Sequence, residues 1–446
     1  MNQELLIYWE SLFRELNKSC DKLIVWKKIK QIEGAFLGLY DLDLLIKTNN
    51  NEYLITVKNY GFFELKSNCF QDKKIRHFFK IDSTTGSVIH LHLYLDLVTG
   101  VGHFKNYAIP DSIIEGLSTQ KHEQFTFLNH FTPQSQKVIE HYRQCIKNKN
   151  LLNIYYRKKK AVLYGDNSPY FDKQKGNSSN KRPIYKTDQT EKISKNSENC
   201  KIWRRKEIRI THFIKGYIYL IAAKAELIPK KYYRKPGFFL AIIGPDGVGK
   251  STMVSNVTNC FNKISCSKNA SLGRIWSGNN NSKRSKSTVS IRSPIFNHFK
   301  NLVVASIRGL KFIVVRIQLK LGYIVITDRV MLDIIGAVDS PRIPLGENTN
   351  LTQKIISKIE QKIYGICPKP NLTIILKAPL ESVLKRNQKR TKQGKETDEE
   401  IKMRYHAFFK YCEHYQNSIV IDSDRNEKVV SNDVISIINK YFVENQ

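Results

Sequence analysis

The sequence predicts a two-domain α/β protein, with a parallel sheet covered by helices in its C-terminal part and a smaller α+β domain before it. Its 446 residues exceed a typical single domain, and 41% of them are hydrophobic, which is enough for packed cores. After residue 237, helical stretches alternate with four apolar runs that we expect to form buried strands, as in parallel sheets: FFLAII, YIVIT, LTIIL and SIVI. Between 157 and 205, apolar residues are scarce, which indicates a linker.

Residues 1–150 alternate helical and extended patterns, as in a small α+β domain. GLYDLDLLI at 38–46 places Asp41 and Asp43 two residues apart on an apolar strand, so their side chains point to one face. VIHLHLYLDLV at 88–98 is a second alternating strand, whose His90, His92, Tyr94 and Asp96 share a face. Because acids from neighbouring strands hold Mg²⁺ in two-metal sites, Asp41, Asp43 and Asp96 are candidate metal ligands. His90 and His92 are either further ligands or ordinary polar residues of an exposed sheet face.

The linker at 157–205 begins with RKKK and continues in Asn, Ser and Lys. Its cations are diluted with acids and lack an aromatic rhythm, so we favour a solvated tether over a nucleic-acid-binding arm. Residues 206–236 predict a mostly helical lead-in, and Pro236-Gly237 marks the start of the second domain, 237–446.

The second domain opens with a strand, a glycine-rich loop and a helix. FFLAII at 238–243 has the continuous apolar character of a central parallel strand, and GPDGVGKST follows it at 244–252. Glycines let backbone N–H groups turn toward phosphate oxygens, and the helix N-terminus adds partial positive charge. Lys250 is placed to reach the β and γ phosphates, and the Ser251 hydroxyl to bind Mg²⁺. The motif predicts a loop that binds ATP and Mg²⁺ through Gly244, Pro245, Asp246, Gly247, Val248, Gly249, Lys250, Ser251 and Thr252.

Three later segments extend this pattern. YIVITDR at 323–329 is a buried strand that ends in Asp328 and Arg329, PKPNLTIILKAPLESVLKRNQKR at 368–390 combines a strand with a basic helix, and IVIDSD at 419–424 precedes a terminal amphipathic helix. Together with G-x-D-G-x-G-K-S-T, these segments resemble the thymidylate kinase branch of the nucleoside monophosphate kinases over residues 237–446. The resemblance implies a P-loop kinase domain with ATP and Mg²⁺ as cofactors.

The same resemblance implies roles for individual residues. Asp246 would meet a sugar hydroxyl of the acceptor, Arg329 would hold the acceptor phosphate with its planar fork, and Asp328 would lie beside Mg²⁺. Val248 stands where one subgroup has a loop arginine, so the transition-state cation would come from the basic run that includes Arg386 and Arg390. A solvated basic face is the alternative for that run. The expected catalytic residues are Lys250, Asp328, Arg386 and Arg390.

Three positions depart from the family's pattern. Val330 replaces an aromatic residue, Lys377 an acid, and Asp333 a serine. These changes bear on recognition of a thymine base more than on phosphoryl transfer. We therefore expect a nucleoside monophosphate or a related phosphorylated compound as acceptor.

The order of the two domains narrows the prediction. A nucleotidyltransferase-like unit with D-L-D-L-L and I-H-L-H, placed before a kinase domain, resembles the two-domain thymidylate kinase-like proteins found with bacterial surface-polysaccharide genes. That resemblance implies an ATP- and Mg²⁺-dependent phosphotransferase. A bifunctional or regulatory sugar-nucleotide protein is one alternative, and a nucleic-acid-associated P-loop NTPase is another.

Charge and cysteine content bound the partners. The net charge of +33 suits phosphate-rich partners, although an AT-rich genome also enriches Lys, Asn and Ile, and the scattered cations give no strong nucleic-acid signal. The eight cysteines show no C-x-x-C pair, so neither a zinc site nor a disulfide framework is predicted. The N-terminus lacks a signal-peptide pattern, and charges interrupt the apolar run at 301–326, so we expect a cytoplasmic protein without a transmembrane segment. A homodimer is left open.

Overall fold

The structure is a computed structural model. It describes residues 3–67, 74–101, 104–109, 111–147, 222–225, 228–229, 232–264, 266–270, 294–332, 334, 337, 340–341, 351–388 and 397–445. Contacts divide the chain into two units: unit 1 comprises Met1–Lys80, Ser87–Tyr232 and Phe442–Gln446, and unit 2 comprises Ile81–Gly86 and Tyr233–Tyr441. The expected linker at 157–205 lies outside the described residues, as does most of the lead-in at 206–236.

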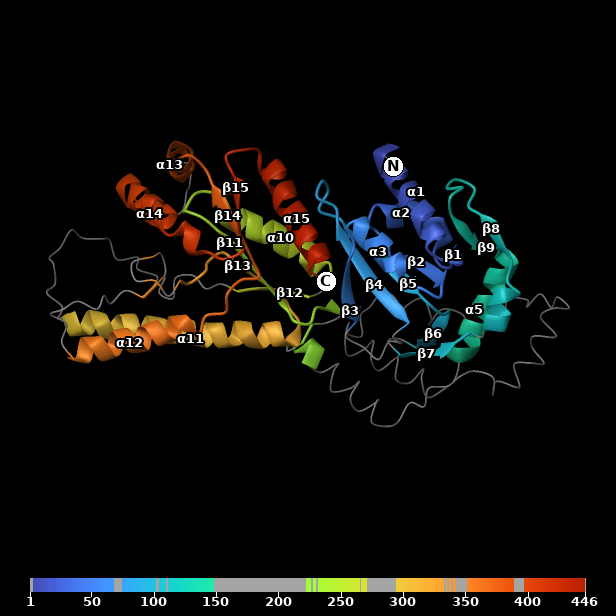
Figure 1. Ribbon diagram of the computed structural model, residues 1–446, viewed down its shortest axis with the longest axis horizontal. Coiled ribbons are helices and arrows are strands. Elements are labelled where there is room, and N and C mark those ends of the chain that lie inside the picture. Colours follow the sequence, from blue (N-terminus) through green and yellow to red (C-terminus); the bar gives the residue numbers. More distant parts are fainter. Residues whose placement is uncertain are drawn as a thin grey trace, which may run out of the picture. The chain divides into compact units, whose positions relative to one another are not determined.

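Unit 1 is built on a mixed sheet (Figure 1). Its order is β10-β3-β4-β5-β2-β1-β9-β8, in which β2 pairs parallel with β5 and antiparallel with β1. The strands are β1 (Lys22–Val25), β2 (Leu42–Lys47), β3 (Phe63–Ser67), β4 (Ile75–Ile81), β5 (Val88–Tyr94), β8 (Thr119–Lys121), β9 (Asn129–Phe131) and β10 (Tyr232–Tyr233), with a separate hairpin of β6 (Val98–Val101) and β7 (Phe104–Ala108). The helices are α1 (Gln3–Lys18), η1 (Ile29–Gln31), α2 (Ile32–Phe36), α3 (Glu52–Asn59), α4 (Asp111–Glu115) and α5 (Pro133–Lys147).

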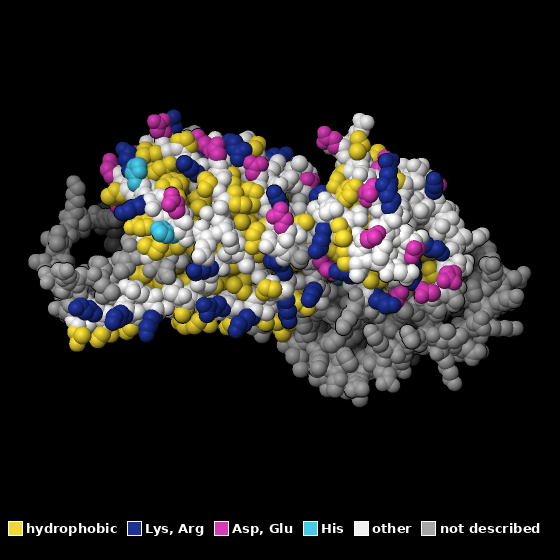
Figure 2. Space-filling view, viewed as in Figure 1, with side chains coloured by type: hydrophobic (Ala, Val, Ile, Leu, Met, Phe, Trp, Pro, Cys, Tyr) yellow, Lys and Arg dark blue, Asp and Glu magenta, His cyan; other side chains and the backbone are white. Residues whose placement is uncertain are grey.

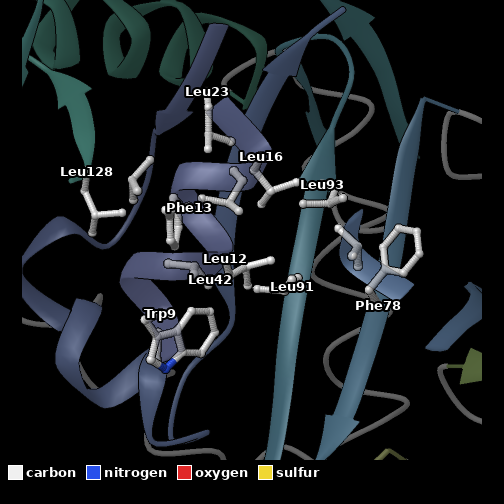
Figure 3. Close-up of a cluster of buried hydrophobic side chains, with 14 of the residues drawn as sticks. Trp9, Leu12, Phe13, Leu16, Leu23, Leu42, Phe78, Leu91, Leu93 and Leu128 are labelled. Atoms are coloured by element: carbon white, nitrogen blue, oxygen red, sulfur yellow. The ribbon is translucent and has the colours of Figure 1, made fainter. Parts of the chain in front are cut away.

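Strand alternation separates two cores in unit 1. Leu42, Leu44 and Ile46 of β2 join a large cluster with residues of α1, α2 and α3 (Figure 3). Leu45 of the same strand joins a second cluster with Ile139 of α5. Asp43 therefore belongs to the face covered by α5, because side chains two positions apart point the same way.

Unit 2 contains a five-stranded parallel sheet with helices on both sides (Figure 1). Its order is β12-β13-β11-β14-β15, which places β11 at the centre. The strands are β11 (Phe238–Ile243), β12 (Ser267–Asn269), β13 (Ile324–Thr327), β14 (Leu372–Lys377) and β15 (Ser418–Asp422). The helices are α10 (Lys250–Asn262), α11 (Pro294–Leu321), α12 (Leu351–Gly365), α13 (Leu380–Gln388), α14 (Asp398–Lys410), η3 (Cys412–His414) and α15 (Glu427–Glu444).

The expected α/β fold with a parallel sheet covered by helices is therefore present in unit 2. All six residues of β11 are buried, as the apolar run FFLAII predicts. The buried strand expected around 418–422 is different, because β15 is an edge strand on which only Ile421 is buried. The apolar run at 301–326 divides into the larger part of α11 and the buried strand β13. Of the helices in the described ranges, none has the length and apolarity needed to cross a membrane.

Candidate functional site

The loop between β11 and α10 has a backbone that requires glycine. Gly247 and Gly249 have φ values of 103° and 100°, in the left-handed region that side chains disfavour. A Cβ atom at Gly247 would also lie 2.9 Å from Val383 Cγ1, whereas one at Gly249 would meet nothing within 4 Å. The loop is thus close to α13 on one side and open at the start of α10.

The side chains of the loop divide into packing and polar groups. Val248 is buried, and its Cγ2 atom would lie 2.8 Å from a Cβ atom at Gly244. Pro245 is also buried, and its carbonyl oxygen accepts a hydrogen bond of 2.8 Å from Lys250 Nζ. Ser251 and Thr252 are exposed in the first turn of α10. The structure therefore keeps the hydroxyl groups accessible where the first turn begins.

Lys250 and Asp246 form an ion pair within the loop. Lys250 Nζ donates to Asp246 Oδ1 at 3.2 Å, and Arg404 of α14 lies 3.3 Å from Asp246 Oδ2. Burial alone favours the neutral acid, but the charges of Lys250, Arg329 and Arg404 hold the pKa of Asp246 at about 2. Burial and the nearby Arg329 charge lower the pKa of Lys250, against the opposing charges of Asp246 and Asp328.

Asp328 and Arg329 follow the strand next to β11. Ala241 of β11 pairs with Thr327 of β13 in parallel register, so both strands end at one edge of the sheet. The Arg329 backbone N–H donates to Thr327 Oγ1 at 3.3 Å, which fixes the turn after β13. The charges of both residues act on Lys250: Arg329 lowers the pKa of its ammonium group, and Asp328 raises it.

Arg404 is a residue of this site that sequence reasoning missed. It lies 158 positions from Asp246 in the chain, so no local motif marks it. A capping box of Thr397 and Glu400 starts α14, and Tyr405 donates to the Ala378 carbonyl oxygen at 3.0 Å after β14. The T-D-E-E segment after the basic run is a helix-start signal. It predicts α14, but it does not predict that Arg404 of this helix contacts Asp246.

The basic run is only partly described. Arg386 donates to the Ser423 carbonyl oxygen at 3.0 Å and pairs with Asp424 at 3.2 Å, in the segment after β15. The structure therefore places Arg386 against Asp424. Arg390 and Asp333 lie outside the described residues.

Two of the family departures have structural roles. Val330 is buried in a cluster with Ala241, Ile243 and Phe408. Lys377 places its Nζ atom 5.7 Å from the centre of the Phe409 ring. Val330 thus packs in an apolar core, and the Lys377 ammonium group lies over an aromatic ring.

Unit 1 holds a second polar constellation, on β2 and β5. Asp43 pairs in parallel register with His92, and their Oδ1 and Nδ1 atoms lie 3.0 Å apart. Asp41, just before β2, lies 2.9 Å from His90 Nδ1, and His90 Nε2 lies 3.1 Å from His77 Nδ1. The structure therefore brings Asp41, Asp43, His90 and His92 together.

Two lysines also approach these acids. Lys27 Nζ lies 3.7 Å from Asp43 Oδ1 and donates to the Tyr94 hydroxyl at 3.0 Å. Lys28, whose φ is 54°, lies 3.9 Å from Asp41 Oδ2. Burial and the Asp43 charge raise the pKa of Tyr94, so its hydroxyl stays protonated.

Asp96 does not join Asp41 and Asp43, which corrects the expected three-acid metal site. Asp96 lies 3.0 Å from Lys47, at the opposite end of β2 from Asp43, and also pairs with Lys74. The cause is the parallel register: Asp43 aligns with His92, so residues further along β5 align with the far end of β2. Within the described ranges, no group of three or more His, Cys, Asp and Glu side chains is arranged to hold a metal ion.

Comparisons with known proteins give structural matches only. No family model matches the chain, and no curated protein matches it. Among solved structures, it is similar to a thymidylate kinase from Candida albicans, with 17% identity, a TM-score of 0.29, and coverage of 46% of this chain and 94% of that one. It is also similar to a deoxyadenosine kinase from M. mycoides with bound dATP, with 15% identity, a TM-score of 0.30, and coverage of 45% and 100%. With TM-scores this low, the fold is assigned from the strand order and pairing described above.

Proposed function

We propose that unit 2 is an ATP- and Mg²⁺-dependent phosphotransferase that acts on a phosphorylated acceptor such as a nucleoside monophosphate. The observation that carries the proposal is the meeting of Lys250 and Asp246 in a glycine loop, beside Asp328 and Arg329 at the same sheet edge. A P-loop needs this cation at the start of a helix, and phosphoryl transfer is mainly positioning and charge stabilisation.

The loop residues fit a nucleotide phosphate. Gly249 leaves open space where a Cβ atom would stand, and Lys250 follows it as the first residue of α10. ATP would supply the transferable γ-phosphoryl group, with Mg²⁺ held by Ser251 and Asp328. Lys250 would exchange its bonds to Asp246 and the Pro245 carbonyl oxygen for charge-assisted bonds to phosphate oxygens.

The acceptor side uses the remaining charges. Arg329 binds the acceptor phosphate through its planar guanidinium, and Asp246 orients an acceptor hydroxyl. Arg404 holds the Asp246 carboxylate on the side opposite to Lys250, since the two cations contact different carboxylate oxygens. Arg404 therefore acts as a positioning residue for Asp246.

A nucleic-acid-associated NTPase is less well supported, because Asp328 and Arg329 follow β13, whereas a motor would be expected to have paired acids at the end of this strand.

We propose that unit 1 handles substrate or regulates unit 2. Its nucleotidyltransferase-like character stays a proposal that rests on Asp41 and Asp43. The structure gives these acids His90 and His92 as partners in place of a third acid.

The function is tested by incubating the full chain with ATP and Mg²⁺ against a panel of nucleoside monophosphates and sugar phosphates. Product mass and ADP formation are measured for each acceptor. The proposal expects acceptor-dependent ADP formation with at least one phosphorylated product. ADP formation that is equal with and without every acceptor would contradict it.

A further inference from the structure

The helices α11 and α12 pack against each other through one face of each. Ala305 and Phe312 of α11 are buried in a cluster with Tyr364 of α12. A Cβ atom at Gly309 would lie 3.0 Å from Ile363 Cγ2, so the two helices approach closely. Arg308 is buried and donates to the Tyr364 hydroxyl. These side chains of α11 and α12 are therefore buried between the two helices.

The opposite face of α11 is apolar and exposed. At about 100° per residue, its exposed apolar side chains lie on one stripe of the helix, since they recur every three, four or seven positions. The stripe consists of Val303, Leu310, Ile313, Val314 and Ile317, which are 36–65% exposed. On α12, Leu351, Ile355 and Ile359 are also exposed. Isolated exposed apolar residues are ordinary, but a continuous stripe indicates a binding surface.

The exposed charged side chains described on α11 and α12 are of one sign. α11 contains no Asp or Glu, and Lys311 and Lys320 lie on opposite sides of its apolar stripe. On α12, Lys354, Lys358 and Lys362 are exposed, while its one acid, Glu360, is buried. Figure 2 shows dark blue and yellow side chains along the lower left edge, where Figure 1 places α11 and α12.

We propose that this face, the exposed sides of α11 and α12, binds the surface of an anionic lipid bilayer. Apolar side chains enter the boundary between headgroups and acyl chains, while the lysine stems extend along it and place their ammonium groups on lipid phosphates. The flanking arrangement of Lys311 and Lys320 suits a helix lying in the membrane plane. This surface goes beyond phosphoryl transfer and would deliver the enzyme to a membrane-bound acceptor or product.

The lysines and the apolar stripe together favour an anionic bilayer over a second copy of the chain or a nucleic acid. A second copy packed on the same face by two-fold symmetry would bring lysines against lysines, which is unfavourable. A nucleic acid would pair with the lysines but leave the apolar stripe in water. An anionic bilayer satisfies both the cations and the stripe.

The test is co-sedimentation of the full chain with vesicles of phosphatidylcholine, either alone or mixed with phosphatidylglycerol. We expect binding to the mixed vesicles, with at least tenfold more lipid needed when phosphatidylglycerol is absent. Raising the salt concentration from about 0.1 M to about 1 M should weaken binding, because surface charges are then screened within about 3 Å.

Variants locate the surface. Replacing both Leu310 and Ile317 with serine should raise the lipid concentration for half-binding by about tenfold or more. The matched control replaces Ile55 and Val429, which are also exposed, with serine. This variant should bind the mixed vesicles as the wild type does. Replacing Lys354 and Lys358 with glutamine should weaken binding about fivefold per lysine. Circular dichroism checks that each variant is folded. If the serine variant does not fold, the glutamine variant still tests the surface.

Three outcomes would overturn the proposal. Equal binding to neutral and anionic vesicles contradicts the charge argument, and wild-type binding by the serine or the glutamine variant places the contact elsewhere. A wild-type dimer that does not bind vesicles, and that becomes monomeric in the serine variant, identifies a second copy as the occupant. Failure of the acceptor panel alone leaves vesicle binding intact, so the two proposals fail separately.

Discussion

The two units of this protein both place carboxylates at strand ends, yet they surround them differently. In unit 2, Asp246 and Asp328 share the loop region with the cations Lys250, Arg329 and Arg404. In unit 1, Asp41 and Asp43 are each met by one histidine and one lysine.

The difference in charge separates their chemistry. Three cations face two carboxylates in unit 2, which leaves a positive excess for phosphate groups. In unit 1, Lys27 and Lys28 balance two carboxylates. A divalent metal there would have to displace the lysines without help from a third acid. The comparison therefore favours unit 2 over unit 1 as the place of the proposed phosphoryl transfer.

The largest expected effect is that of Lys250→Ala. Loss of the cation at the transferring group should lower kcat about 10²–10³-fold, as for other single groups that stabilise a transition-state charge. Steady-state rates of ADP formation measure this effect. Lys402→Ala removes an exposed lysine of α14 and should leave the rate unchanged. Equal loss in both variants would indicate a general charge effect.

Arg329→Ala should act on the acceptor. Removing charge-assisted hydrogen bonds to a phosphate costs about 1.5–3 kcal/mol, so the acceptor KM should rise about tenfold to hundredfold. The KM for ATP should stay within about twofold. An unchanged acceptor KM with a raised ATP KM would move Arg329 to the nucleotide side.

Gly249→Ala tests the loop backbone. A side chain at φ of 100° should destabilise unit 2 by about 1–2 kcal/mol and weaken ATP binding, although the added Cβ atom itself meets open space. Gly365→Ala is the matched control, because its Cβ atom also meets nothing and no left-handed φ constrains it. Urea unfolding of both variants measures the difference. Equal stabilities would remove the strain argument.

Asp246 links stability of unit 2 to pH. Its pKa of about 2 in the folded protein is below the ordinary value of about 3.9, so its stabilising contribution is present above pH about 4 and is lost as pH falls toward 2. Asp246→Asn should therefore flatten the fall in unfolding free energy between these pH values, measured by urea unfolding. Asp433→Asn, which removes an exposed carboxylate paired with Arg425, controls for the lost charge. An equal flattening in both would contradict a specific role for Asp246.

The smallest expected effect is that of replacing both Asp41 and Asp43 with asparagine. If unit 2 alone binds ATP, the Kd of the full chain for ATP should change by less than about twofold, which is under about 0.4 kcal/mol. Isothermal titration measures it. A large loss of ATP binding would show that the two units share the nucleotide site.

The sequence predicts the strand, glycine loop and helix at 238–262 well because their geometry is local. Contiguous residues from Gly244 to Thr252 contain the glycines, the lysine and the helix start, and β11 before them is one apolar run. Asp96 shows the opposite case, because its position depends on the parallel register of β5 against β2, which alternation alone does not reveal.

Long-range pairing explains the other misses. Arg404 reaches Asp246 only because α14 is anchored after β14 through Tyr405, which no periodicity predicts. β15 is exposed because it lies at the edge of the sheet. Its run SIVI is apolar, but the run alone does not show which place the strand takes in the strand order. Sequence patterns thus predict elements, and the order of strands decides which faces they bury.

The most direct test of the central claim follows the γ-phosphoryl group of labelled ATP. The full chain is incubated with Mg²⁺, the acceptor panel and ATP that carries ³²P at the γ position, and the label is separated into phosphorylated acceptor and inorganic phosphate. Our account predicts that the label appears in an acceptor, and that Lys250→Ala slows this transfer about 10²–10³-fold. Label found only in inorganic phosphate, at a rate independent of every acceptor, would show an NTPase and contradict the assignment of a kinase.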